Sequence, residues 1–198
     1  MPKIFTQSGR EKLRRQLLRN GLALFCENGY METSVDDIVR SAGVSRGLFY
    51  TMFPSKEEFA LQALQDRQEI VYEMVTYFMA QTNLPVEQRI WNIIEACIRN
   101  EKKMFSFLKL KDTYRIAAHV PQERMDVYME VQEEFFAKIV RLMGKDPARC
   151  DPKVVANLAT VFFQGISTIK GRPFLHQDVI DETVECFARA FWNYIVTH

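Results

Sequence analysis

Apolar residues recur every three or four positions along almost the whole chain, which is the spacing of one face of an α-helix. No sustained alternation of apolar and polar residues, the pattern of a half-buried strand, interrupts this spacing. Glycine, asparagine and proline divide the pattern into about nine segments. We expect helices over residues 8–27, 35–41, 46–53, 56–80, 85–100, 101–118, 122–143, 152–170 and 176–196. The sequence therefore predicts an all-α fold.

Capping residues place the boundaries of the first helices. Asn28 and Gly29 form a stop signal after the first helix, and Thr33 or Ser34 caps the second. Gly43 breaks the second helix, and Ser45 caps a third. We expect a small N-terminal domain of three helices over residues 1–56 and a larger helical domain over residues 57–198. The long fourth helix joins the two and can carry motion between them.

The third expected helix has two unlike sides. Phe49 and Phe53 are i, i+4 neighbours that should pack inward. A second side carries polar groups and a glycine, contributed by Arg46, Gly47, Tyr50 and Thr51. A short helix with such a side fits a DNA major groove, which is about 12 Å wide. With Gly43 in the turn before it, the pattern predicts a helix-turn-helix.

Each polar residue of this segment has a rationale in DNA binding. Arg46 can donate two hydrogen bonds to guanine, although a phosphate contact or an unengaged surface arginine fits the same sequence. Gly47 lets the backbone approach the bases, and Tyr50 and Lys56 can contact phosphates. The hydroxyl groups of the cap residues Thr33 and Ser34 are expected near phosphate.

Charge is distributed unevenly along the chain. The net charge is only +1, yet residues 1–56 contain nine Lys and Arg against five Asp and Glu. The rest of the chain contains 17 basic and 20 acidic residues. A basic front indicates a polyanion partner. Residues Arg10–Arg15 can bind flanking phosphates or a minor groove, or form a solvated helix face.

The stretch ALFCENGYMETSVDDIVRSAGVSRGLFYTMFPSKEEF, from Ala23 to Phe59, closely resembles the tetracycline-repressor (TetR) family of bacterial transcription regulators. The resemblance implies a DNA-binding domain, a helical ligand-binding domain and a homodimer whose last two helices form a four-helix bundle. It also implies that Ser34, Tyr50 and Lys56 contact phosphates and that Ser45, Arg46 and Gly47 begin the recognition helix. Leu48 and Met52 stand where the family commonly has polar or small residues.

The last two expected helices carry apolar faces wider than one protomer can bury, which favours a dimer. The expected dimer interface contains Phe162, Phe187, Phe191, Trp192 and Ile195.

Aromatic residues are frequent after residue 57, and adjacent aromatic pairs cannot both face one core. We expect some of them to line a pocket for a small apolar or aromatic effector. The candidate lining is Trp91, Phe105, Phe107, Tyr114, Tyr128, Phe136 and Phe163. For each of them an ordinary core position is the competing interpretation, and His119 is either a polar ligand contact or a helix-end residue.

Several classes of protein are disfavoured. No secretory signal is visible, and the longest uncharged run, Val154–Ile169, is shorter than the ~20 residues of a membrane span. We therefore expect a cytoplasmic protein without a membrane partner. The four cysteines are far apart and no histidine has metal-ligand spacing, so we expect buried free thiols, with a redox-sensing cysteine left open, and neither metal nor cofactor.

No nucleophile elbow or phosphate-binding loop occurs, so an enzyme is not expected. The sequence predicts a ligand-responsive transcriptional regulator that binds double-stranded DNA as a homodimer. In the form we expect, it is a repressor released from a palindromic operator by its effector. The alternative is a helical dimeric interaction or ligand-binding module without specific DNA binding.

Overall fold

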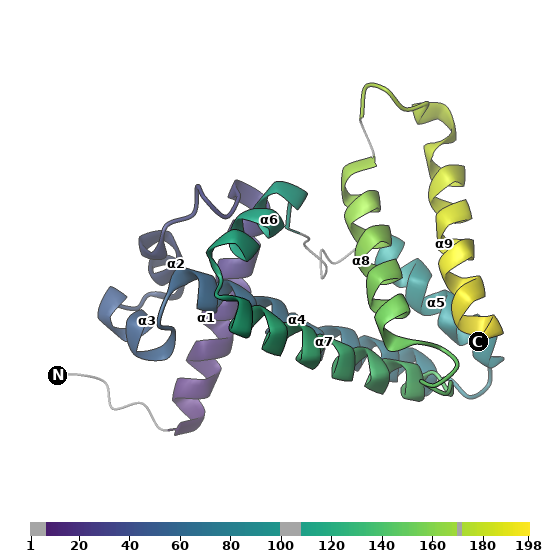
Figure 1. Cartoon of the computed structure of the whole chain (residues 1–198), viewed down its shortest axis with the longest axis horizontal. Helices are drawn as coiled ribbons and strands as arrows, with labels where there is room; N and C mark the ends of the chain where they lie inside the picture. The colour runs from purple at the N-terminus through teal and green to yellow at the C-terminus, as the bar shows by residue number, and fades with distance from the viewer. Residues whose placement is uncertain (1–6, 100–107, 170–171) are drawn as a thin grey trace. The chain divides into compact units, whose positions relative to one another are not determined.

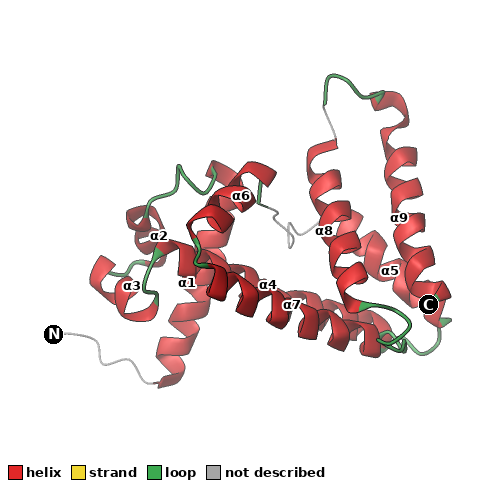
Figure 2. Ribbon diagram, in the orientation of Figure 1, coloured by secondary structure: helices red, strands yellow, loops and turns green. Residues whose placement is uncertain are grey.

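The computed structural model describes residues 7–99, 108–169 and 172–198. Within these ranges the chain forms nine α-helices and one 3-10 turn, and no strand (Figures 1 and 2). The all-α prediction is confirmed. The helices are α1 (Gln7–Asn28), α2 (Val35–Ala42), α3 (Arg46–Met52), α4 (Lys56–Met79), α5 (Val86–Arg99), α6 (Leu110–His119), α7 (Gln122–Leu142), α8 (Pro152–Ile169) and α9 (Ile180–Thr197).

Most helices begin and end within two residues of the expected positions. The helix expected over 101–118 is described only from Leu110 onwards, because residues 100–107 lie outside the described part of the chain. The last expected helix begins with a separate 3-10 turn, Gln177–Val179, before α9. In the described residues, no helix combines the length and the apolar character needed to cross a membrane.

The described residues form two compact units. The first contains residues 7–69 and 108–125, and the second contains residues 70–99, 126–169 and 172–198. The helices α4 and α7 each run from one unit into the other. The first unit also includes α6, which the expected division at residue 56 leaves out. As a division between functions, 1–56 and 57–198 stays a prediction.

The core of the first unit is built around Phe59 of α4. Its ring packs against Phe25 of α1 at 5.9 Å between centroids, and against Phe49 and Phe53 at 5.2 and 4.9 Å. All four rings are fully buried. A seven-residue helix such as α3 is too short to be stable alone, so these contacts hold it in place.

Gly21 of α1 makes room for this ring. A Cβ atom at Gly21 would overlap two atoms of the Phe59 ring. Because Phe59 is enclosed by other rings, it has no free space into which it can turn. The close packing of α1 on α4 therefore requires glycine at this position.

In the second unit, α9 packs against α5 and α8. The helices α8 and α9 run side by side in opposite directions (Figure 1). Their buried residues, including Phe162, Ala188, Phe191 and Ile195, join those of α5 and α7 in one hydrophobic cluster. This cluster forms the core of the second unit.

Gly21→Ala should destabilise the protein. Forcing a methyl group against the enclosed Phe59 ring costs ~2–3 kcal/mol, and the higher helix propensity of alanine offsets ~1 kcal/mol of that, so the net loss is ~1–2 kcal/mol. Thermal unfolding followed by circular dichroism should show a Tm lower by roughly 2–6 °C. Gly47→Ala is the control, because the only atom near a Cβ there is Ser45 Oγ at 4.0 Å. Equal melting temperatures for Gly21→Ala and the wild type would contradict this account of the α1–α4 contact.

The four cysteines differ in burial, and all are free thiols. Cys97 and Cys150 are buried as expected, whereas Cys26 is partly buried and Cys186 is exposed. Burial raises the pKa of Cys26 to about 11 and that of Cys97 to about 12. The buried thiols therefore stay protonated at neutral pH and are poor nucleophiles.

A thiol reagent applied to the native protein at pH 8 should modify Cys186 rapidly, and Cys186→Ser should remove this fast phase. Raising a thiol pKa from 9 to 12 lowers its thiolate fraction about a thousandfold, so Cys97 should react only after unfolding.

The free energy of unfolding should be unaffected by these thiols below pH 9 and should fall as the pH rises from 9 towards 12, because the unfolded thiols ionise first. Fast modification of Cys97 in the native protein would refute its burial.

Candidate nucleic-acid interface

The segment from α2 to α3 forms two helices joined by a tight turn. Ser34 and Asp37 form a capping box at the start of α2, in which each side chain accepts a hydrogen bond from the other residue's backbone N–H. Gly43 ends α2 with a φ of 65°, a left-handed conformation that glycine adopts readily. Ser45 then caps α3, where its Oγ atom accepts a hydrogen bond from the Leu48 N–H at 3.2 Å. These local contacts explain why the expected helix-turn-helix forms.

The helix α3 has a buried side and an exposed side. Phe49 and the C-cap residue Phe53 are fully buried, as expected from their spacing. Arg46, Gly47 and Tyr50 are exposed, and 45% of the surface of Tyr50 is accessible. The structure thus brings together three of the residues expected to face DNA.

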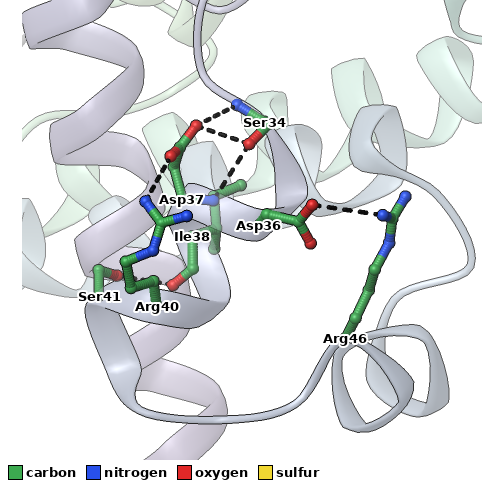
Figure 3. A network of polar contacts seen from close by, with 7 residues as sticks. All are labelled: Ser34, Asp36, Asp37, Ile38, Arg40, Ser41 and Arg46. Atoms are coloured by element: carbon green, nitrogen blue, oxygen red, sulfur yellow. Dashed lines mark hydrogen bonds and ion pairs between the residues drawn. The ribbon is translucent and has the colours of Figure 1, made fainter.

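Arg46 reaches from α3 to α2. Its Nη1 atom lies 3.4 Å from Asp36 Oδ2 (Figure 3). Its guanidinium carbon lies 5.9 Å from the centre of the Tyr50 ring. The Arg46 side chain is 61% exposed, so this ion pair is open to solvent. The sequence analysis did not predict this contact with Asp36, which lies on a different helix.

Comparison with known proteins bears directly on this segment. Residues 17–63 match the model of the family described as bacterial regulatory proteins, tetR family. This N-terminal segment is similar to the tetR family. The match includes all of α2 and α3 and the Phe59 ring that holds them.

Two curated relatives match the chain over part of their length. The HTH-type transcriptional repressor DhaR of Mycobacterium sp. (strain GP1) is 33% identical over 89 residues, which are 45% of each chain. The HTH-type transcriptional regulator YwcC of Bacillus subtilis (strain 168) is 40% identical over 62 residues, 31% of this chain and 28% of YwcC. The matches thus span less than half of the length of these relatives.

Solved structures resemble the chain over nearly its whole length. A transcriptional regulator from Saccharomonospora viridis, in complex with choline, has a TM-score of 0.58 at 17% identity and covers 90% of this chain and 96% of that one. The reduced form of E. coli NemR has a TM-score of 0.57 at 15% identity and covers 93% of this chain and 95% of NemR. At these identities the likeness concerns the fold.

The two serines and two threonines expected to contact DNA differ in the hydrogen bonds that their hydroxyl groups already form. The Ser45 hydroxyl oxygen accepts a hydrogen bond from the Leu48 N–H, so the O–H itself can still donate a hydrogen bond to a phosphate. Ser34 instead donates to Asp37 Oδ2 at 2.6 Å. Thr51 donates to Leu48 O at 2.7 Å, which leaves its oxygen only as an acceptor.

Thr33 does not face DNA. It is 1% exposed, and its hydroxyl donates to Gly29 O at 2.9 Å and to Leu24 O at 3.2 Å. The hydroxyl therefore satisfies carbonyl groups at the C-terminal end of α1. The assignment of Thr33 to a phosphate contact was wrong, because a hydroxyl at a helix boundary serves a neighbouring helix equally well.

Lys56 has partners inside the first unit. Its Nζ atom donates to Tyr30 O at 2.5 Å and lies 4.2 Å from the centre of the Tyr30 ring. The ammonium group also sits close to the C-terminal end of α1, where the helix dipole favours a cation. Burial lowers the pKa of Lys56. The expected phosphate contact stays a prediction, and the structure adds a role in holding α4 to the segment after α1.

Part of the N-terminal basic run also serves the fold. Arg14 donates to Gln62, Arg15 pairs with Glu69 at 3.0 Å, and Arg19 pairs with Asp66 at 3.5 Å. These contacts tie α1 to α4. Arg10 and Lys12 are exposed and form no ion pair with any residue that the structure describes. Of the basic residues in this run, these two therefore stay available for the expected phosphate contacts.

The candidate effector-binding residues fall in different places. Phe105 and Phe107 lie outside the described residues, and Tyr114 is 70% exposed on α6 in the first unit. Phe136 and Phe163 are partly buried against the core of the second unit, and Tyr128 is partly buried on α7. His119 ends α6 and is exposed, with its Nδ1 atom 2.7 Å from Arg115 O.

Trp91 lines a hollow of about 370 Å³ in the second unit. The other lining residues are Pro85, Glu87, Gln88, Arg189 and Trp192. The Trp192 ring stands edge-on to Trp91 at 6.4 Å, and its Nε1–H donates to Glu87 O at 2.9 Å. Arg189 covers the Trp91 ring at 5.0 Å. The Trp192 indole N–H and the face of the Trp91 ring thus have partners within the protomer.

Three expected dimer residues are core residues of their own protomer. Phe162, Phe191 and Ile195 are at most 7% exposed and belong to the hydrophobic cluster of the second unit. Their assignment to an interface needs correction, because the intramolecular packing of α5 and α7 already covers this face. Phe187 of α9 is 57% exposed, and Val161 and Val154 of α8 are 61% and 36% exposed, so both helices keep some apolar surface.

No group of three or more His, Cys, Asp or Glu residues in the described part of the chain could hold a metal ion.

Lys56→Ala should lower the stability of the first unit as well as any DNA affinity. Loss of the charged hydrogen bond to Tyr30 O and of the ring contact should cost about 1–2 kcal/mol. Urea unfolding would measure this cost, with Lys12→Ala as an exposed control of the same charge change. A Lys56→Ala protein as stable as the control would show that the ammonium group does not support the fold.

Proposed function

We propose that the chain is a transcriptional repressor that binds a DNA operator as a homodimer and is released by a small effector. The proposal is carried by α3, which is held from behind by Phe49 and Phe53 and presents Arg46, Gly47 and Tyr50 to the outside. The match of residues 17–63 to the tetR family supports it, and the relative DhaR is named a repressor. A protein with this function acts on the chromosome in the cytoplasm.

The exposed groups of the helix-turn-helix have different proposed roles in binding DNA. Arg46 donates to the O6 and N7 atoms of a guanine, and Gly47 allows the backbone to approach the bases because its surroundings are open. Tyr50 and Ser45 donate to phosphates, and Arg10 and Lys12 bind phosphates on the flank. Phosphate contacts fix the position on the duplex, whereas Arg46 selects the sequence.

A dimer would place two α3 helices in successive major grooves. The grooves on one face of a palindromic site are about 34–36 Å apart. The apolar groups that remain exposed on α8 and α9, chiefly Val161 and Phe187, offer a surface for the second copy. Burial of these side chains would supply the hydrophobic contribution to association.

The second unit is the proposed site of effector binding. The similar structure from Saccharomonospora viridis holds choline, which supports a small-molecule site in this fold. The many aromatic residues of this unit, including the Trp91 hollow, favour an apolar or aromatic effector. An effector that binds one arrangement of the units more tightly than another shifts the balance between them, and α4 runs continuously from one unit to the other.

A second candidate function is a helical dimeric interaction or ligand-binding module without specific DNA binding. Leu48 and Met52 are partly exposed on α3, where the family commonly offers polar or small residues. Fewer polar groups on this helix would weaken contacts to bases and phosphates.

Selection from random genomic fragments with the purified full chain, followed by sequencing, tests the proposal. The wild type should enrich a palindromic site, and sedimentation of its complex should show two protomers per site. Arg46→Ala should bind with a flatter base preference, losing about 1–3 kcal/mol at one base pair of each half-site. Gly47→Ala should fold normally and bind more weakly.

Enrichment of no fragment by a folded wild type would favour the module without DNA binding. An unchanged site preference for Arg46→Ala would refute the proposed role of Arg46.

A further inference from the structure

Two arginines of the helix-turn-helix are held by carboxylates of α2. Asp36 Oδ2 lies 3.4 Å from Arg46 Nη1, and Asp37 Oδ1 accepts a hydrogen bond from Arg40 Nη1 at 3.0 Å (Figure 3). The side chains of Arg46 and Arg40 are 61% and 76% exposed, so solvent reaches both pairs. The surface proposed to meet a polyanion thus carries negative charge beside its cations.

The two carboxylates have different tasks. Asp37 accepts hydrogen bonds from the backbone N–H and the hydroxyl of Ser34 as well as from Arg40, and these bonds lower its pKa. It is part of the cap that starts α2. Asp36 takes no part in this cap, and its one ion pair among the described residues is with Arg46. Asp36 lies in the first turn of α2, where the helix dipole favours a carboxylate, and its charged partner is Arg46 on the next helix.

Arg46 is the first residue of α3, where the helix dipole disfavours a positive charge. The first turn of α3 contains no acidic residue, so the compensating charge comes from Asp36 on the preceding helix. An exposed pair of this kind is weak and exchanges readily with other partners. The pair can therefore hold Arg46 in the free protein and still allow it to bind DNA.

We infer that Asp36 is a specificity-determining residue, which keeps the guanidinium group of Arg46 from binding phosphates and leaves it available to a guanine. The inference rests on the proposed DNA-binding function. A phosphate that binds Arg46 lies close to the Asp36 carboxylate, and the two negatively charged groups repel each other. The O6 and N7 atoms of guanine carry no net charge, and a guanidinium group has five N–H donors. Arg46 can therefore donate to a guanine while it stays beside Asp36.

The test is Asp36→Asn, which removes the charge with little change in shape. The first probe is a mixed-sequence DNA duplex, titrated with the full chain at several salt concentrations. With Arg46 free to bind a phosphate, the slope of log K against log salt should steepen by about 0.9, and the affinity at ~0.1 M salt should rise about eightfold. The second probe is the best fragment from the genomic selection, for which the gain should be smaller, so the ratio of specific to non-specific affinity should fall severalfold.

Two matched controls separate this mechanism from a simple change of net charge. Glu27→Gln makes the same charge change at an exposed residue of α1 that forms no ion pair within the described residues, and its affinity for the mixed-sequence duplex should change less than twofold. In an Arg46→Gln background, Asp36→Asn should give no gain, because its effect acts through Arg46. Thermal unfolding of each variant establishes that it is folded before titration.

Four outcomes would count against the inference. An unchanged salt slope for Asp36→Asn, weaker binding to both probes, an equal gain for both probes, or an equal gain for Glu27→Gln would each overturn it while the proposed function stands. A folded wild type that binds no duplex at low salt would instead overturn the proposed function itself.

Discussion

The packing of the Phe59 ring is the constraint on which the candidate interface depends. The ring lies between phenylalanines of α1 and of the α3 segment, and Gly21 gives it the space to do so. A helix of seven residues has too few internal hydrogen bonds to persist alone, so its direction is set by this contact. Once Phe49 points inward, helical geometry puts Arg46, Gly47 and Tyr50 on accessible sides of the same helix.

Much of the basic character of the first unit is used within the fold. Arg14, Arg15 and Arg19 connect α1 to α4, and Lys56 binds a backbone carbonyl after α1. Such residues add to the positive field around the unit even though their side chains already have partners. The groups that remain for direct contact with DNA are fewer than the sequence suggests, and the carboxylate of Asp36 restrains one of them. The character of this surface therefore depends on pairing as much as on the number of charges.

The second unit differs from the first, because many of its aromatic residues pack within its own core. Phe162 and Phe191 meet in the core at 5.9 Å between ring centres, and the only two tryptophans of the chain stand edge-on to each other. An abundance of aromatic residues thus contributes first to the stability of the unit. The apolar surface left on α8 and α9 is limited to a few side chains such as Val161 and Phe187.

The helices, their caps and the turn between α2 and α3 follow from the local sequence alone. Each of these depends on residues within four positions of one another, such as Ser34 with Asp37, or on the backbone freedom of Gly43. The local sequence also determined which side of α3 is buried, because Phe49 and Phe53 lie one turn apart.

Only the tertiary structure decided which polar groups stay available and which apolar groups stay exposed. The contacts of Arg46 with Asp36, of Lys56 with Tyr30, and of Trp192 with the backbone of Glu87 join different helices or a helix and a loop. Helical periodicity gives the face on which a residue lies, but not the neighbour that this face meets. Partners across an interhelical contact are fixed by how the helices pack, and that packing is a property of the whole fold.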